Sequence, residues 1–385
     1  LFSAAYISGY VKLPAIVENR LHLRKPLTTF SGVVSYNGAF VGDIVMSPIH
    51  YASPRLSLTS QGFHFYGTIS PSLKHFSGKL IGQPMSLHFK KAGLNETVMT
   101  LSPASTQFNF TKTPLGLWVG SSSSTITDET VRVMLGGKTK PLVMRYHNVN
   151  DHLQLTLKNN QYSLALQATV GRYQGLTKVL MNDLQIDLAI NNLNAPVFKG
   201  MQDLFSQNIG LMNDKQVARN VAMQLGSLAP NLITKHTVVK LNKFSFNLPK
   251  GAVSLNGQVS VPQYQPGMSF FLLPALMNAK LHMVVGKGLA DYYLKMARKV
   301  HQAVILRSLP QMEPGPVIKG SVKKVSHYVP VKKPTLSSRE EFLVAFDKIM
   351  TSALQKGYVA NTANTYETTI IKAQGKFTAN GKAIK

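Results

Sequence analysis

Regular alternation of apolar and polar residues on both sides of short turns most constrains the fold of this chain. Between His152 and Ala168, apolar residues occupy every second position on either side of Asn159-Asn160. Successive side chains of a β-strand point to opposite faces, and asparagine tolerates the positive φ angles of a two-residue turn. We therefore expect this segment to form a β-hairpin with one apolar and one polar face.

The same pattern fills most of the first half of the chain. Hairpins are expected around Asn37-Gly38, between Thr29–Tyr36 and Ala39–Met46, and around Gln61-Gly62, between Arg55–Ser60 and Phe63–Ser70. Further strands are expected at Lys79–Lys90, Thr97–Leu101, Gln107–Thr111, Leu115–Gly120 and Thr125–Leu135. From Leu184 to Ile190 the alternation continues, so residues 1–195 are predicted to be a β-rich antiparallel region.

After Asn194 the apolar residues recur at helical spacing. Helices are expected at Pro196–Gln207, Asn213–Gly226, Gly288–Leu309 and Ser337–Gly357, the last opened by a capping box of Ser337 and Glu340. Strands return at Val238–Leu248, Val253–Val261, Tyr366–Ile371 and Lys376–Ala379, and a basic loop is expected at 310–335. Residues 196–385 are thus predicted to be a mixed helix and hairpin region that continues the sheet. The predicted class is α+β and predominantly antiparallel β: an elongated curved sheet of many hairpins with a few flanking amphipathic helices.

Composition limits the type of protein and its partners. The 385 residues are 44% hydrophobic and 15% charged, which is typical of a folded chain, and they include no cysteine. Structural disulfides and thiolate metal sites are therefore excluded. The formal net charge of +26 attracts polyanions. Nucleic acid is the weaker candidate partner, because no arginine-rich arm, zinc-finger spacing or aromatic RNA-binding signature accompanies the charge.

No arrangement of residues predicts catalysis, a cofactor or a metal site. His147 and His152, with Asp151 beside them, lack the helical or alternating spacing of a metal site. Gly136–Thr139 resembles the end of a phosphate-binding loop, but Arg132 stands where its first glycine should be. Ser321 and Lys324 match a penicillin-binding motif without its partner motifs. We therefore expect a protein that is not an enzyme.

Several stretches of the sequence resemble a known family when taken together, namely 30–38, 183–194, 279–284, 357–359, 366–372 and 375–382. They stand in the order found in the YdgA/YihF family of bacterial envelope proteins, and the end of the chain resembles that family's closing hairpin. This resemblance implies a periplasmic protein of unknown function, anchored in the inner membrane by an N-terminal segment. Since the sequence begins without methionine and almost at once in strand-like sequence, we expect that segment to be absent from it.

One candidate site remains, and it is electrostatic. Ten lysines and arginines lie between Gly286 and Lys333, against two acids. The helix 288–309 is expected to pack on the sheet through Leu289, Tyr293, Met296 and Val300. The cations expected to bind an anionic lipid or lipopolysaccharide surface are Lys295, Arg298, Lys299, Lys319, Lys323 and Lys324. The alternative is an ordinary solvated helix face and loop.

Two functions follow as expectations. The first is a structural or interaction protein of the cell envelope, with envelope proteins or a second copy as partners. The second is a carrier that holds a lipid or acyl ligand in an apolar groove of the sheet.

Overall fold

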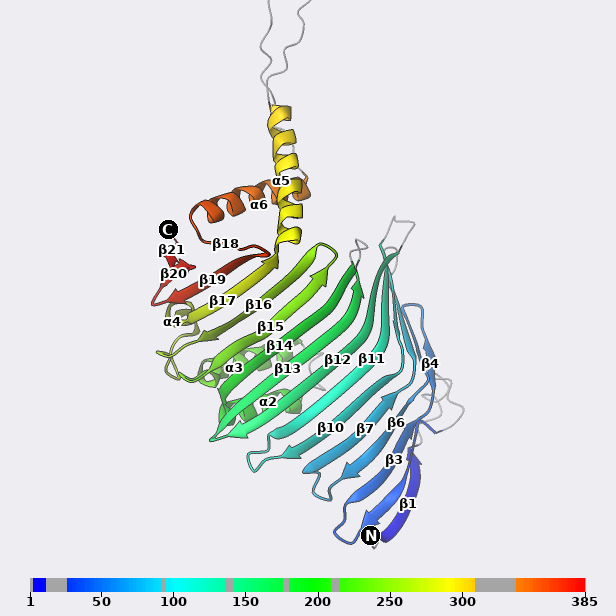
Figure 1. The fold of residues 1–385 in the computed structure, drawn as a ribbon. Helices are drawn as coiled ribbons and strands as arrows, with labels where there is room; N and C mark the ends of the chain where they lie inside the picture. The colour runs from blue at the N-terminus through cyan, green and yellow to red at the C-terminus, as the bar shows by residue number, and fades with distance from the viewer. Residues whose placement is uncertain are drawn as a thin grey trace, which may run out of the picture.

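The computed structural model describes residues 3–11, 26–91, 95–135, 141–175, 180–208, 215–308 and 337–384. Figure 1 shows a broad, curved sheet with helices at one face and at one end. The sheet has 21 strands, and its strand pairs within the described residues are antiparallel. The predicted α+β class with one large antiparallel sheet is confirmed.

The first half of the chain supplies fourteen strands. They are β1 (Ser3–Val11), β2 (Thr28–Ser35), β3 (Phe40–Met46), β4 (Ile49–Ala52), β5 (Leu56–Ser60), β6 (Phe63–Ile69), β7 (His75–Gly82), β8 (Met85–Lys91), β9 (Asn95–Leu101), β10 (Ala104–Lys112), β11 (Trp118–Leu135), β12 (Leu142–Lys158), β13 (Gln161–Gln174) and β14 (Leu180–Asn194).

The second half adds helices and the remaining strands. The helices are α2 (Ala195–Asn208), α3 (Lys215–Leu232), the 3-10 turn η2 (Phe270–Leu272), α4 (Leu273–Leu276), α5 (Lys287–Ser308) and α6 (Ser338–Gln355). The strands are β15 (Val238–Leu248), β16 (Gly251–Ser260), β17 (Asn278–Gly286), β18 (Ala360–Asn361), β19 (Thr365–Ala373), β20 (Lys376–Ala379) and β21 (Lys382–Ala383). The helix expected to stop at Gly226 continues to Leu232, so that this glycine lies inside α3.

Neighbouring strands follow one another across most of the sheet. From β10 to β17 each strand pairs with the next, and β17 then pairs with β19. On the other side, the order outward from β10 is β7, β6, β3, β2 and β1. The first part of β11 pairs with β10 and its second part with β9, from which β8, β5 and β4 continue.

Where the partner of β11 changes from β10 to β9, a line of interrupted strands crosses the sheet. We call this line the crease; along it, four chain segments each leave one strand and enter the next. The interruptions lie at Ser47-Pro48, Gln61-Gly62, Gln83-Pro84 and Ser102-Pro103. Proline has no N–H to donate, so it ends the regular ladder. Two hydrogen bonds join neighbouring interruptions along the crease: the Gln61 N–H donates to the Pro84 carbonyl at 3.0 Å, and the Gln83 N–H donates to the Gly62 carbonyl at 3.0 Å. The neighbouring chain segments therefore remain paired there.

Near the crease, the observed strands differ from the expected ones in two places. Lys79–Lys90 is two strands, β7 and β8, because Pro84 divides it. Conversely, Leu115–Gly120 and Thr125–Leu135 belong to one strand, β11. The four serines 121–124 between them lack an apolar pattern, yet they pair with both β10 and β12.

Two helices cover part of the sheet's apolar face, which we define as the face of Leu155, Leu164 and Ile190. Figure 1 shows α2 and α3 behind the sheet, and these three side chains pack with Leu193 and Phe198. The Tyr162 ring stacks on Phe198 with 4.7 Å between ring centroids, and the Tyr162 hydroxyl donates to the Trp118 carbonyl at 2.8 Å. This cluster fixes α2 on the ends of β11 to β14.

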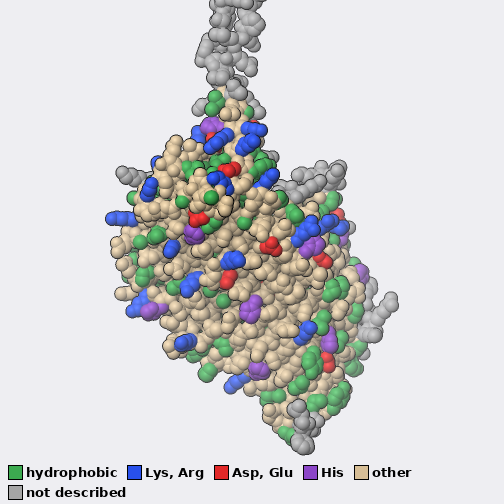
Figure 2. Space-filling model, in the orientation of Figure 1, with side chains coloured by type: hydrophobic (Ala, Val, Ile, Leu, Met, Phe, Trp, Pro, Cys, Tyr) green, Lys and Arg blue, Asp and Glu red, His purple; other side chains and the backbone are tan. Residues whose placement is uncertain are grey.

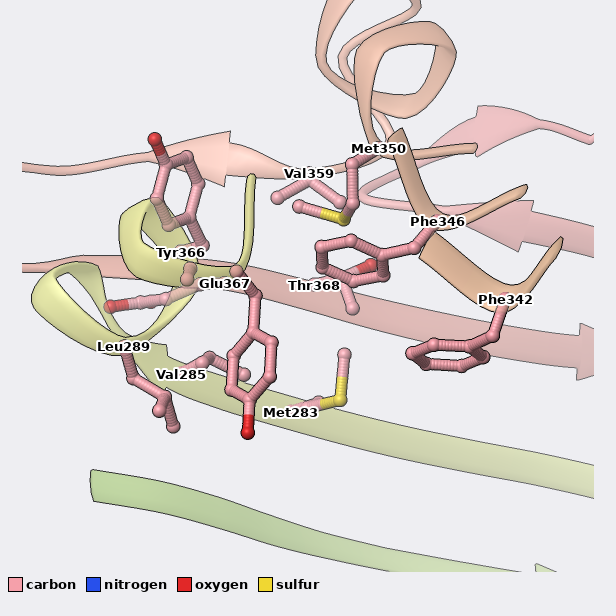
Figure 3. Close-up of a pocket in the computed structure, with 12 residues that line it drawn as sticks. Met283, Val285, Leu289, Phe342, Phe346, Met350, Val359, Tyr366, Glu367 and Thr368 are labelled. Carbon is pink, nitrogen blue, oxygen red and sulfur yellow. The ribbon is translucent and has the colours of Figure 1, made fainter. Parts of the chain in front are cut away.

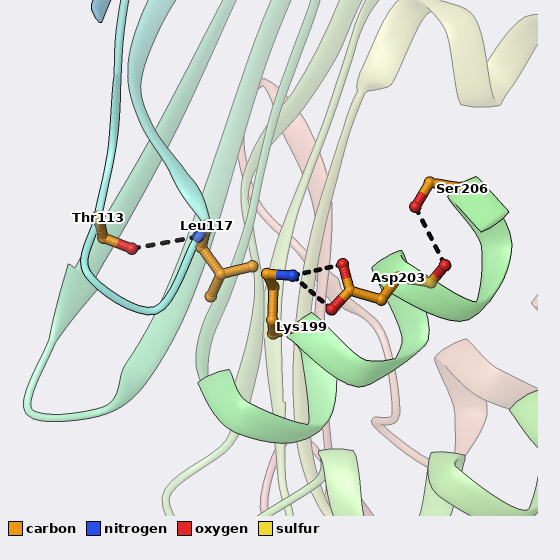
Figure 4. A network of polar contacts seen from close by, with 5 residues as sticks. All are labelled: Thr113, Leu117, Lys199, Asp203 and Ser206. Atoms are coloured by element: carbon orange, nitrogen blue, oxygen red, sulfur yellow. Dashed lines mark hydrogen bonds and ion pairs between the residues drawn. The ribbon is translucent and has the colours of Figure 1, made fainter. Parts of the chain in front are cut away.

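Separate polar contacts stabilise α2 and the β10–β11 turn where the two elements lie close together (Figure 4). Lys199 forms an ion pair with Asp203 one helical turn later, and the Thr113 hydroxyl accepts from the Leu117 N–H at 3.2 Å. At Gly116 φ is +78°, and a Cβ there would lie 2.6 Å from the Lys199 side chain. The turn therefore favours glycine for its backbone angle, while the end of the Lys199 side chain could move aside for a Cβ.

The opposite face of the sheet is polar. Figure 2 shows this face, with few hydrophobic side chains over its central strands and scattered lysines, arginines and histidines. His152 on β12, whose ring bonds the Ser123 hydroxyl at 2.7 Å, and Lys240 on β15 belong to it. The alternation expected from the sequence thus holds over the central strands, whereas near the first end of the sheet Val41, Val45 and Tyr66 are exposed on this face.

Candidate functional site

A lateral row of residues crosses the apolar face from β1 to β19, with one residue from each strand. Its members stand opposite one another in successive strand pairs, so they share a face. We call this the central row. In order, it consists of Gly9, Phe30, Ile44, Phe65, Leu80, Thr106, Ser124, Asp151, Ala168, Ile186, Phe244, Leu255, Met283 and Thr368.

Aromatic rings strengthen the apolar character of the row near its first end. The rings of Phe65, Phe76 and Phe108 stack, with 4.6 to 5.7 Å between their centroids. Next to the central row, Gly67 and Gly78 face each other across β6 and β7. A Cβ on either glycine would lie 2.7 Å from the Phe65 ring. The glycines therefore let this ring lie flat across the sheet.

Most of the row's apolar side chains are only half-buried. Ile186, Phe244 and Leu255 are partly exposed although they stand mid-sheet. The helices contact the sheet elsewhere: α2 and α3 lie against β13 and β14, and α5 lies against β16, β17 and β19. Between α2 and α3 on one side and α5 and α6 on the other, the apolar face is open to a ligand.

The central row ends in a pocket beneath α5 and α6. The cavity holds about 390 Å³, within the range of small-molecule sites. Figure 3 shows Phe342, Phe346 and Met350 of α6 facing Met283 and Val285 of β17. Its further lining residues are Leu289, Ala290, Tyr293, Val359, Tyr366, Glu367 and Thr368. The lining is thus almost wholly aromatic and aliphatic.

The rim of this pocket is unusually apolar for a surface. Phe342 is 64% exposed, and Met283 and Tyr293 are each 37% exposed. Ile349, one turn beyond Phe346 on α6, is 66% exposed. Exposed apolar side chains next to an apolar cavity are typical of a surface that a ligand or partner covers.

Helix α6 is held over the pocket by α5. Asp347 of α6 is 9% exposed; its Oδ2 lies 3.1 Å from His301 Nδ1 and its Oδ1 lies 3.7 Å from Arg298 Nε. Around these polar side chains, Leu294, Ala297 and Leu343 are buried. The capping box of Ser337 and Glu340 is present at the start of α6, as predicted.

A buried tyrosine closes the inner end of the pocket. The Tyr366 hydroxyl donates to Asp291 Oδ1 of α5 at 2.8 Å. Burial raises the pKa of Tyr366 above its usual value near 10, and the hydrogen bond to Asp291 raises that pKa further. The phenol is therefore neutral at physiological pH and acts as a fixed hydrogen-bond donor between β19 and α5.

The structure changes the expected role of helix 288–309. The expected apolar stripe included Tyr293, Met296 and Val300, but the buried residues of α5 are Leu289, Ala290, Leu294 and Ala297. The reason is that only the first turns of α5 meet the sheet; the helix then projects away from it and packs on α6 (Figure 1).

The structure describes three of the six candidate cations, namely Lys295, Arg298 and Lys299 of α5. Lys295 and Lys299 are exposed, and Figure 2 shows lysine and arginine side chains gathered on α5. Arg298 is exposed too, as expected, and its Nε also lies 3.7 Å from Asp347 Oδ1 of α6. Lys319, Lys323 and Lys324 lie outside the described residues, as does the expected loop 310–335.

The histidine and carboxylate cluster considered in the sequence is dispersed. His147 pairs with Asp128, and His152 bonds Ser123, so neither contacts Asp151. In the part of the chain that the structure describes, no three histidine or acidic side chains are grouped so that they could hold a metal ion. Over the same residues, no helix combines the length and hydropathy needed to cross a membrane.

A family model described as "Bacterial protein of unknown function (DUF945)" matches residues 16–385. Neither a curated protein nor a solved structure matches the chain.

Proposed function

The chain belongs to the DUF945 family of bacterial proteins of unknown function, and we propose that it binds an acyl chain or a similarly long apolar ligand. The observation that carries this proposal is the 390 Å³ pocket under α5 and α6. Each methylene group buried there contributes about 0.8 kcal/mol. Since Met283 belongs both to the pocket and to the central row, a long ligand can continue from the pocket along the sheet.

We propose further that this role is non-enzymatic and belongs to the bacterial cell envelope. Support comes from the likeness to the YdgA/YihF envelope proteins of residues 30–38, 183–194, 279–284, 357–359, 366–372 and 375–382. On this proposal the protein works in the periplasm, anchored in the inner membrane by a segment that precedes the present sequence. A ligand-binding sheet anchored there would hold a lipid in the periplasm, beside the inner membrane.

A second candidate function is an interaction module that joins sheets edge to edge. Within the described residues, β1 pairs only with β2, and its sequence contains no charged residue. Tyr6 and Tyr10 on it are 69% and 59% exposed. Long uncharged edge strands are templates for pairing with another chain.

The lipid proposal is tested by native mass spectrometry with lipid extraction, followed by calorimetric titration with decanol. We expect co-purified lipid, or decanol binding to the emptied protein. Met283→Trp should weaken decanol binding about tenfold, because the indole would displace roughly two buried methylene groups. Met223→Trp is the matched control, since Met223 is 57% exposed on α3, away from the pocket. Absence of both lipid and decanol binding would reject the proposal in favour of the interaction module.

A further inference from the structure

The central row is interrupted by polar residues at one place. On one side lie Phe65 and Leu80, and on the other lie Ala168 and Ile186. Between them, Thr106, Ser124 and Asp151 stand opposite one another on β10, β11 and β12. The Thr106 hydroxyl donates to the Ser124 hydroxyl at 3.1 Å, which places both side chains on the same face. We call these three residues the polar triad.

Asp151 is the unexpected member of the triad. It alternates with Leu153 and Leu155 along β12 and stands opposite Ala168 of β13, so its carboxylate belongs to the apolar face. It is half-buried, and no hydrogen bond or ion pair joins it to another described residue. A half-buried carboxylate to which no described side chain donates keeps its oxygens available to accept hydrogen bonds from a ligand.

Its charge has the opposite sign to that of the molecule. Although the chain carries a net charge of +26, the charged member of the central row is an acid. The three neighbouring side chains offer carboxylate and hydroxyl oxygens as acceptors, which match the three N–H donors of a primary ammonium group. A phosphate or carboxylate group would be repelled by Asp151.

We propose that the polar triad binds the primary ammonium head group of an amphiphile whose chain lies along the apolar face. This inference rests on the proposed function and names the class of ligand. From Asp151 to Met283 the row crosses five strand spacings, about 24 Å at roughly 4.8 Å each. A long chain held at the triad therefore extends across Ile186, Phe244 and Leu255 toward the pocket.

The test compares decylamine with decanol, which share a ten-carbon chain and differ in the head group. The full chain, Asp151→Asn and Asp187→Asn are titrated by calorimetry at low salt. Asp187 is the matched control: it is half-buried too, but it lies on the polar face, where Gln167 and Asn242 donate to it at 3.2 and 2.9 Å.

We expect Asp151→Asn to weaken decylamine binding about tenfold or more, because a charge-assisted hydrogen bond is lost, while decanol binding changes less than about twofold. Unchanged decanol binding also reports that the variant is folded. Ser124→Ala, which retains the carboxylate, should weaken decylamine binding by a smaller factor. Equal decylamine binding by Asp151→Asn and Asp187→Asn, with decanol still bound, overturns this inference alone. Failure of the unmodified chain to bind either ligand overturns the proposed function with it.

Discussion

Buried tyrosines link the stability of this protein to alkaline pH. Burial raises the pKa of Tyr146, Tyr162, Tyr264 and Tyr366 above the usual value near 10. Their neutral forms are thus favoured in the folded state, and the unfolded chain releases these protons first. The stability that they contribute is complete below about pH 10 and is lost as the pH rises above it.

We predict that Tyr366→Phe lessens this alkaline loss. The variant removes the phenol whose pKa both burial and Asp291 raise, so its urea midpoint should fall less between pH 9 and pH 11. At pH 7 it should be less stable by about 1–2 kcal/mol, because the bond to Asp291 is gone. Tyr36→Phe is the control, since Tyr36 is 78% exposed. An alkaline loss of equal size in both variants would contradict the prediction.

Single residues that fix a local backbone could be predicted from the sequence. Asn159 and Asn160 take φ angles of 51° and 58°, as the hairpin pattern required. Asp151 could not be assigned this way: beside two histidines it resembled a fragment of a metal site. Only the register of β11, β12 and β13 places it on the apolar face.

At the scale of elements, the crease depends on glycine as well as proline. Gly62 has φ of +93°, and a Cβ there would lie 2.2 Å from the Met46 carbonyl oxygen. We predict that Gly62→Ala lowers the free energy of unfolding by roughly 1–3 kcal/mol. Gly226→Ala should instead raise it by about 0.5–1 kcal/mol, because Gly226 lies within α3 with open space around it. Urea denaturation of both variants checks this, and destabilisation by both would contradict it.

Elements that depend on residues close together in sequence were predictable. The role of an element was less predictable where it depends on packing against distant parts of the chain. The hairpins and the capped start of α6 follow from residues close together in sequence. Phe342, Phe346 and Met350 were recognisable as one apolar stripe of a helix, but the same stripe serves a core or a pocket wall. The stripe lines a pocket here because it faces β17, some sixty residues earlier in the chain, and because α5 projects away from the sheet.

At the scale of the whole molecule, the described sheet leaves its apolar face only partly covered: Ile186, Phe244 and Leu255 are half-buried although they stand mid-sheet. Such a face is stable in water only if its side chains shield one another or if a ligand covers it.

The net charge of +26 raises the question of whether attraction to an anionic membrane is spread over the molecule or concentrated on α5. Lys295 and Lys299 are exposed there, whereas Arg298 faces Asp347 and is better left intact. We predict that Lys295→Glu with Lys299→Glu strongly reduces co-sedimentation with phosphatidylglycerol vesicles at low salt. Each cation near such a surface contributes about 1 kcal/mol, so removing two should weaken binding by roughly tenfold or more.

A charge-matched variant separates the two cases. Lys79→Glu with Lys158→Glu makes the same change in net charge at exposed positions of β7 and β12. If α5 forms the contact, this control should bind nearly as well as the unmodified chain. Binding by all three should fall as salt rises, because the screening length shortens to about 8 Å near physiological ionic strength. Equal losses in the two variants would mean that attraction follows the total charge and that the exposed face of α5 is ordinary solvated surface.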